Sequence, residues 1–475
     1  MTPKKIAQFA IGPLGGALLG FVSLPIMTWV FSQEDIGRIA LLNIFLSFNV
    51  LLFSLGLDQT YVRFYHETGC KNRLLKSVFI PGFFILSIAI LPFLAFQGTL
   101  SKLIFDIDSF FISLTIVVTC YIAFINRFLA LILRMEERGL SFSLSQILPK
   151  LLYVFIAIIL LLCSFQPRFE YILAANVASL TFVFIIFIWS TRTIWAPALK
   201  ERLVYSEVRE LLMFGFPLIF GGVAFWGLTA LDRVFLKYYS TYEELALYSV
   251  SVSFAAAGSI IQSIFSTVWA PTVYKWAAKG VNLNKIDGTI KYVLIVVTIS
   301  FCLIGIFSGL INYMLPSNYG NVQFIVVSCF GYPLLYVLSE TTVVGIGIAK
   351  RTIFAMLASV IACIVNIIGN YYLVPVYGAA GAAASTSISF YIFFILRTEF
   401  SIYLWRHIPR IKLYSFTTLS LFGAVIHALY GFEYNFLMKI YWIALLVICM
   451  SYFRFDLLQS VDYFKTRLKT NKSVQ

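Results

Sequence analysis

Long apolar segments separated by short polar breaks make up almost the whole chain of 475 residues. An α-helix needs about 20 apolar residues to cross the hydrocarbon core of a bilayer. That length, read against the charged breaks, predicts about fourteen spans and therefore an all-α, polytopic membrane bundle. The spans are 6–31, 37–57, 77–97, 110–133, 146–164, 171–190, 211–231, 245–268, 292–314, 323–345, 352–373, 378–396, 414–430 and 438–453.

Composition supports a membrane protein. The chain is 60% hydrophobic and only 12% charged, whereas about 25% charged residues is usual for a soluble domain. Lys4 and Lys5 precede the first apolar run as in a signal peptide. That run continues to Phe31, which is too long for a cleaved segment, so we expect an uncleaved first span.

The net charge of +14 is explained by topology. With the N-terminus inside, 27 Lys and Arg residues fall in cytoplasmic segments and 6 in outer loops. Because cytoplasmic loops of membrane proteins are enriched in Lys and Arg, this asymmetry predicts a multi-pass membrane protein with both termini cytoplasmic. It also removes the need for a nucleic-acid partner.

The two halves of the chain share an order of motifs, which predicts an internal duplication. Each half has a proline in its first span, then a glycine pair, an apolar run and an acidic pair. The matching positions are Pro13 with Pro217, Gly15–Gly16 with Gly221–Gly222, and Glu34–Asp35 with Glu243–Glu244. Proline bends a membrane helix, and breaks at matching positions of two repeats point to a substrate region, so Pro13 and Pro217 are candidate hinges.

Six spans per half make the two repeats parallel. We therefore expect a six-helix lobe over 1–190, a cytoplasmic linker over 191–210 and a second six-helix lobe over 211–400. Residues 401–475 would add two helices and a basic cytoplasmic tail.

Five motifs occur in order along the chain: LGLDQTYVRFYHE, FGFPLIFGG, LDRVFL, ELALYSV and VNIIGNYYLVPVYGAAGAAAST. In these motifs the chain resembles the polysaccharide-transporter branch of the multidrug/oligosaccharidyl-lipid/polysaccharide exporter superfamily, which includes bacterial O-antigen flippases. The resemblance implies a V-shaped bundle of two six-helix lobes with a central cavity. It also implies that an undecaprenyl-diphosphate-linked oligosaccharide is flipped across the inner membrane by alternating access.

Such a substrate has an anionic diphosphate and a polar sugar head, so its carrier needs cations and a polar lumen. Arg127, beside Asn126 in the fourth span, and Lys150 in the fifth are cations inside apolar runs. Intramembrane cations usually face a lumen or a partner, so these residues are candidates for the diphosphate. The alternative is that both side chains extend to the interface.

Glu340 is the acidic residue well inside a span, and its protonation would offer a way to couple transport to an ion gradient. The alternative is a structural ion pair. Asp58 with Arg63, and Asp232 with Arg233, stand at predicted span ends as candidate gate ion pairs or interfacial anchors.

Polar stripes at helical spacing are candidates for the glycan pathway or for helix packing. The eighth span carries Ser259, Gln262, Ser263 and Ser266, and the second carries Asn43, Ser47 and Ser54. Asn366 and Asn370 form a further pair that would contact the lumen or a neighbouring helix.

The main alternative function is a drug or cation exporter of the same superfamily. Inside the predicted spans, however, the cations Arg127 and Lys150 outnumber the acid Glu340, which favours an anionic substrate. A peptidoglycan-precursor or teichoic flippase has the same charge pattern. A membrane glycosyltransferase or polymerase would need acidic catalytic residues and a large outer loop, and a channel would need a filter motif.

The sequence predicts no catalytic residue, cofactor or metal site, because the seven cysteines are scattered and no nucleotide-binding motif is present. Expected partners are the lipid-linked glycan, membrane lipid, a polysaccharide polymerase and a chain-length regulator.

Overall fold

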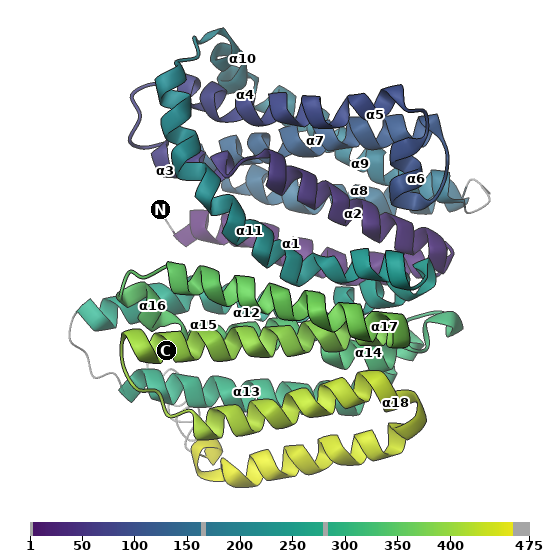
Figure 1. Ribbon diagram of the computed structural model, residues 1–475, viewed down its shortest axis with the longest axis vertical. Helices are drawn as coiled ribbons and strands as arrows, with labels where there is room; N and C mark the ends of the chain where they lie inside the picture. The colour runs from purple at the N-terminus through teal and green to yellow at the C-terminus, as the bar shows by residue number, and fades with distance from the viewer. Residues whose placement is uncertain (1–2, 163–167, 279–283, 459–475) are drawn as a thin grey trace, which may run out of the picture. The chain divides into compact units, whose positions relative to one another are not determined.

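The computed structural model describes residues 3–162, 168–278 and 284–458, in which all regular structure is helical (Figure 1). Cys163, Lys279 and the predicted tail from residue 459 lie outside these ranges. The helices are α1 (Pro3–Thr28), α2 (Gln33–Phe53), α3 (Leu57–Phe64), α4 (Lys71–Ile90), α5 (Pro92–Ala95), α6 (Thr99–Phe105), α7 (Phe110–Met135), α8 (Gly139–Leu162), α9 (Phe169–Ser190), α10 (Arg192–Lys200), α11 (Tyr205–Tyr239), α12 (Tyr242–Ala278), α13 (Asn284–Phe307), η1 (Ser308–Tyr313), η2 (Ser317–Tyr319), α14 (Val322–Cys329), α15 (Gly331–Thr342), α16 (Val344–Ile348), α17 (Ile353–Leu404) and α18 (Ile411–Tyr452). The all-α prediction is confirmed.

Twelve helical segments in the described ranges are long and apolar enough to cross a membrane, which confirms the polytopic prediction. Two of them are far longer than one span, since α17 has 52 residues and α18 has 42. Each contains one residue with a non-helical backbone, Gly378 in α17 and Tyr434 in α18. Each part beside a break reaches the lower limit of about 17 residues for a span, so each of these two helices covers two predicted spans.

Some helices continue well past the predicted span ends, because the prediction treats a charged residue as a break. The seventh span was expected to end at residue 231, but α11 continues to Tyr239 and so contains Asp232 and Arg233. The twelfth was expected to end at residue 396, but α17 continues to Leu404 and contains Arg397. These charges lie inside helices because tertiary partners, described below, satisfy them.

Both prolines at the expected hinges lie within regular helix. Pro13 is inside α1 and Pro217 is inside α11, and neither helix has a residue with non-helical dihedral angles. The hinge role of the two prolines stays a prediction.

The chain forms two compact units, described separately here. The first contains residues Met1–Ile260 with Ser359–Ala382, and the second contains Ile261–Ala358 with Ala383–Gln475. Within the first unit α1 packs on α8, α8 on α9, and α2 on both α7 and α11.

Close approach of α1 and α8 depends on glycines four residues apart. Gly12, Gly16 and Gly20 form one stripe of α1. The Ser143 hydroxyl of α8 accepts a hydrogen bond from the Gly12 amide at 2.9 Å, a distance that a side chain on Gly12 would prevent. Small residues at such spacing allow helix backbones to approach closely in a membrane.

The predicted linker over 191–210 contains the short helix α10, which is tied to α4. The Lys76 ammonium donates to the backbone oxygens of Leu199 and Glu201, each at 2.7 Å. Arg73 donates to Glu207 at 3.3 Å. The segment between the two predicted lobes is therefore docked on the first unit.

In the second unit the two arms of α18 fold back on each other beside α13 (Figure 1). Trp442 is fully buried, and its indole Nε1 donates to His427 Nδ1 at 2.8 Å across the two arms. Gly305 of α13 and Gly423 of α18 face the Trp442 ring, where a Cβ would overlap it. This indole is therefore the centre of the α13–α18 packing.

We expect Gly305→Ala to lower the free energy of unfolding by about 1–3 kcal/mol, because the added methyl group overpacks the Trp442 site. Thermal unfolding of the purified protein in detergent measures the effect. Gly288→Ala is the control in the same helix, since open space surrounds its Cβ position. Equal melting temperatures for the two variants would contradict the packing argument.

Candidate functional site

Two adjoining cavities lie in the first unit. One, the Arg127 cavity, has a volume of about 680 Å³ and is lined from α2, α3, α7, α8 and α9. The other, the Lys150 cavity, has a volume of about 540 Å³ and is lined from α1, α2, α8, α9, α11 and α12. They share the lining residues Asn43, Gln146, Pro149 and Leu180. Both volumes are in the range of ligand sites, about 300–1,000 Å³.

Arg127 lies on α7 and pairs with Asp58 of α3. Its Nη2 and Nε donate to one Asp58 carboxylate oxygen at 2.6 and 3.2 Å. The Asp58 side chain is 10% exposed, whereas that of Arg127 is 46% exposed and lines the cavity. Asn126, next to Arg127, donates to the Leu180 carbonyl at 3.3 Å and also lines this cavity.

The Asp58–Arg127 pair differs from the gate pair expected from sequence. Arg63 pairs with Glu67 one turn further along the chain, on the exposed surface. Asp58 therefore holds a cation 69 residues away instead of its near neighbour. Arg63 does not line either cavity.

Lys150 follows Pro149 in α8 and reaches α1. Its ammonium donates to the Gly16 carbonyl at 2.6 Å, on the glycine stripe that brings the two helices together. The side chain lines the Lys150 cavity together with Arg233 of α11. Lys150 and Arg233 thus bring two basic side chains to the lining of one cavity.

Amides and hydroxyls, which a polar solute would require, stand among the mostly apolar side chains of the lining. Asn43, Ser47 and Ser54 of α2 line the Arg127 cavity, as one reading of their stripe predicted. Sequence reasoning missed Gln146 and Asn176, which also line the site. Asn176 is buried, with 7% of the residue exposed, and its Oδ1 has no hydrogen-bond partner among the described residues.

Asp232 lies at the centre of a buried polar cluster formed by α11, α12 and α17. Its carboxylate accepts hydrogen bonds from the Tyr248 hydroxyl at 2.5 Å and from the side-chain amides of Asn370 at 2.7 Å and Asn366 at 3.1 Å. Asp232 and both asparagines are fully buried. The Asn366–Asn370 spacing, noted in the sequence, indicated an interhelical contact but not its partner.

Arg233, the next residue of α11, lies outside the Asp232 cluster and lines the Lys150 cavity. Its Nε donates to the Ser249 hydroxyl at 3.2 Å, and its guanidinium lies over the Tyr248 ring at 5.3 Å. Arg233 faces the Lys150 cavity, whereas its neighbour Asp232 faces the asparagines of α17.

Glu340 forms a buried ion pair within the second unit. Its carboxylate is 2.9 Å from Arg397 Nη1, and the two side chains are 12% and 11% exposed. The same nitrogen donates to the Ser339 hydroxyl at 2.7 Å, and the guanidinium lies over the Phe393 ring at 4.8 Å. The pair joins α15 to α17.

The polar stripe of α12 contributes to neither cavity. Ser259, Gln262 and Ser263 lie on α12, where the division between the two units falls after Ile260. Gln262 Oε1 is buried without a hydrogen-bond partner in the described part of the chain. A lumen role for these three residues stays a prediction.

Two solved structures of membrane proteins have a fold similar to that of this chain. The chain is similar to the lipid II flippase MurJ in an inward closed conformation, with a TM-score of 0.68 and 18% identity over 95% of this chain and 99% of that one. It is also similar to an inward-facing multidrug resistance MATE family transporter of the MOP superfamily, with a TM-score of 0.57 and 12% identity over 86% of this chain and 96% of that one. These similarities establish the class of fold.

A family model described as "Polysaccharide biosynthesis protein" matches residues 4–276. The chain belongs to this family. An uncharacterized membrane protein of Methanocaldococcus jannaschii is 24% identical over 417 residues, 78% of each chain. The family match covers all the residues that line the two cavities.

We expect Asp232→Ala to destabilise the protein by at least about 2 kcal/mol, because it removes the acceptor for three buried donors. Asp232→Asn should cost less, since it keeps the shape and one oxygen. Thermal unfolding in detergent distinguishes the two variants. Glu243→Ala, which removes an exposed carboxylate of α12, is the control and should leave stability unchanged.

Proposed function

We propose that the protein carries a lipid-linked saccharide with a phosphate-containing linkage across the membrane by alternating access. The observation that supports this most is the charge of the two adjoining cavities. Their lining contains three basic residues, Arg127, Lys150 and Arg233, and one acidic residue, Asp58. Moving a sugar phosphate through hydrocarbon is prohibitive unless polar groups replace its water. The amides and hydroxyls of the lining meet that need.

The fuller form of the proposal takes an undecaprenyl-diphosphate-linked oligosaccharide, such as an O-antigen or similar repeat unit, as substrate. The membrane would be the bacterial inner membrane, with both chain termini in the cytoplasm. Its support is the family membership, the fold shared with a lipid II flippase and the excess of cations on the predicted inner side. The polymerase and chain-length regulator remain proposed partners.

Arg127 has the geometry to exchange an internal anion for a substrate anion. Its planar guanidinium binds carboxylate and phosphate in the same way, with two N–H groups. Because the side chain lines the cavity and is 46% exposed, a diphosphate would be able to reach it and compete with Asp58. The Asp58 pair would keep Arg127 oriented between transport cycles.

Ion coupling is proposed for a buried carboxylate. Glu340 is the residue expected from sequence, and its use would require the ion pair with Arg397 to open. Asp232 accepts hydrogen bonds from three neutral donors. Its neighbour Arg233 lines the cavity, which would let a proton or cation at Asp232 influence the substrate site. We therefore place Asp232 ahead of Glu340.

Deletion of the gene in its host should cause lipid-linked glycan to accumulate, and a wild-type copy should clear it. We expect Arg127→Ala to fail in clearance at normal membrane levels, because the diphosphate loses its bidentate cation. Extraction and quantification of the lipid-linked glycan measure this. Arg63→Ala is the matched control, since Arg63 pairs on the surface outside both cavities.

Normal lipid-linked glycan in the deletion strain, with increased sensitivity to cationic drugs, would instead support an exporter. Clearance by Arg127→Ala at the wild-type rate would remove this arginine from the substrate site and leave the family assignment intact.

In proteoliposomes, an imposed proton or sodium gradient should accelerate translocation by the wild type. We expect Asp232→Asn to translocate at the gradient-free rate whether or not a gradient is present, because it can no longer take up the ion. Glu340→Gln should keep its response to the gradient. If the gradient accelerates translocation by Asp232→Asn and not by Glu340→Gln, the coupling role returns to Glu340. If it accelerates translocation by both variants, neither carboxylate takes up the coupling ion.

A further inference from the structure

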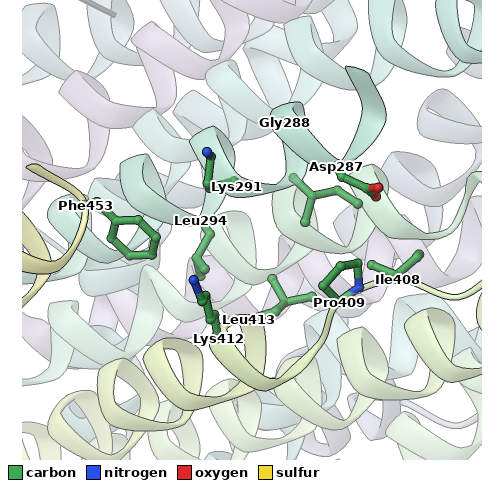
Figure 2. A pocket seen from close by; sticks show the side chains of 10 residues that line it. Asp287, Gly288, Lys291, Leu294, Ile408, Pro409, Lys412, Leu413 and Phe453 are labelled. Carbon is green, nitrogen blue, oxygen red and sulfur yellow. The ribbon is translucent and has the colours of Figure 1, made fainter. Parts of the chain in front are cut away.

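A separate cavity of about 390 Å³ lies in the second unit, where the beginning of α13 meets both ends of α18 (Figure 2). Its walls are mostly apolar. Figure 2 shows Lys291, Lys412 and Phe453 on one side and Asp287 with Ile408 on the other. The lining residues are Asp287, Gly288, Ile290, Lys291, Leu294, Ile408, Pro409, Lys412, Leu413 and Phe453.

The cavity lies at the level where the sequence places the membrane surface. Predicted spans begin at residue 292 and residue 414 and end at residue 453. Lys291, Lys412 and Phe453 are each within two residues of one of these ends. Three span ends far apart in the sequence thus meet around one cavity, on the side predicted to face the cytoplasm. Phospholipid phosphates occupy this level of a bilayer.

The charges around the cavity leave one cation uncompensated. Arg406 donates to both oxygens of Asp287, at 2.7 and 3.1 Å, which neutralises the acid of the lining. Lys291 pairs with Asp456. Lys412 is exposed, and its ammonium lies over the Tyr452 ring at 5.1 Å. Within residues 3–162, 168–278 and 284–458, no carboxylate lies within ion-pair distance of Lys412.

We propose that this cavity binds an anionic phospholipid of the cytoplasmic leaflet. Its phosphate would lie at Lys412, with Lys291 as the second cation, and its acyl chain would cover Leu294, Leu413 and Phe453. Basic pockets between membrane helices on the cytoplasmic side suit such head groups, and each nearby Lys contributes about 1 kcal/mol. The inference depends on the predicted orientation and is independent of the transported substrate.

The C-terminal segment of the chain does not match the site electrostatically. Residues 459–475 contain four Lys or Arg and one Asp. A basic segment would add positive charge beside Lys412, whereas an anionic lipid would neutralise it.

The test is native mass spectrometry of the full chain in detergent, titrated with dioleoyl phosphatidylglycerol or with dioleoyl phosphatidylcholine. We expect the first lipid to bind more tightly to the wild type. Lys412→Gln should weaken that binding about fivefold, the effect of about 1 kcal/mol, and Lys412→Arg should restore it. Lys439→Gln is the matched control, since Lys439 is an exposed cation of the same helix near the opposite predicted surface.

Thermal unfolding without added lipid should be the same for all variants. Weaker lipid binding by Lys412→Gln would then reflect a lost contact with the lipid and not a less stable protein. Equal binding of the two lipids, or unchanged phosphatidylglycerol binding by Lys412→Gln, would overturn the proposal. Displacement of the lipid by millimolar inorganic phosphate would assign the site to a soluble anion and overturn the proposal that a phospholipid occupies it. Failure of phosphate to displace the lipid supports the combined phosphate and acyl-chain contact.

Discussion

Hydrocarbon offers no water to hydrogen-bond polar groups, and this constraint determines how the charged residues of the chain are arranged. Lys150 donates to a backbone carbonyl that a glycine stripe leaves accessible. Asp232 accepts from three side chains of two other helices. Glu340 is buried against Arg397. In each case a group that would be costly in lipid ties together helices that are distant in the sequence.

Two partly open charges, Arg127 and Lys412, differ from the buried Asp232 and Glu340. The Arg127 side chain lines a cavity and stays 46% exposed although Asp58 is beside it. Lys412 lies over an aromatic ring at the edge of its cavity. A cation that is oriented by the protein but still accessible pays little of the reorganisation cost when an anion arrives. For this reason we propose Arg127 and Lys412, each at the lining of its own cavity, as positions where a phosphate would bind.

The apolar pattern predicted the helices well, because the length of a span follows from bilayer thickness alone. The break at Tyr434 of α18 falls between two predicted spans, and the break at Gly378 of α17 is the first residue of the predicted span 378–396. The ends at Asp232 and Arg397 were wrong because the pattern counts a charge as an interruption, whereas a paired charge can lie inside a helix. Partners such as Asp58 and Arg127 could not be predicted, since 69 residues separate them and no local spacing records the contact. For the same reason Gln146 and Asn176 were missed.

The cluster around Asp232 has a consequence for the evolution of the sequence. Positions 232, 366 and 370 lie in two distant segments of the chain but satisfy one set of hydrogen bonds. A substitution at one of them leaves buried donors or acceptors unmet unless the others change with it. Natural variation at these positions should therefore be correlated, so that relatives exchange the acid and its two amides as a set and rarely one at a time.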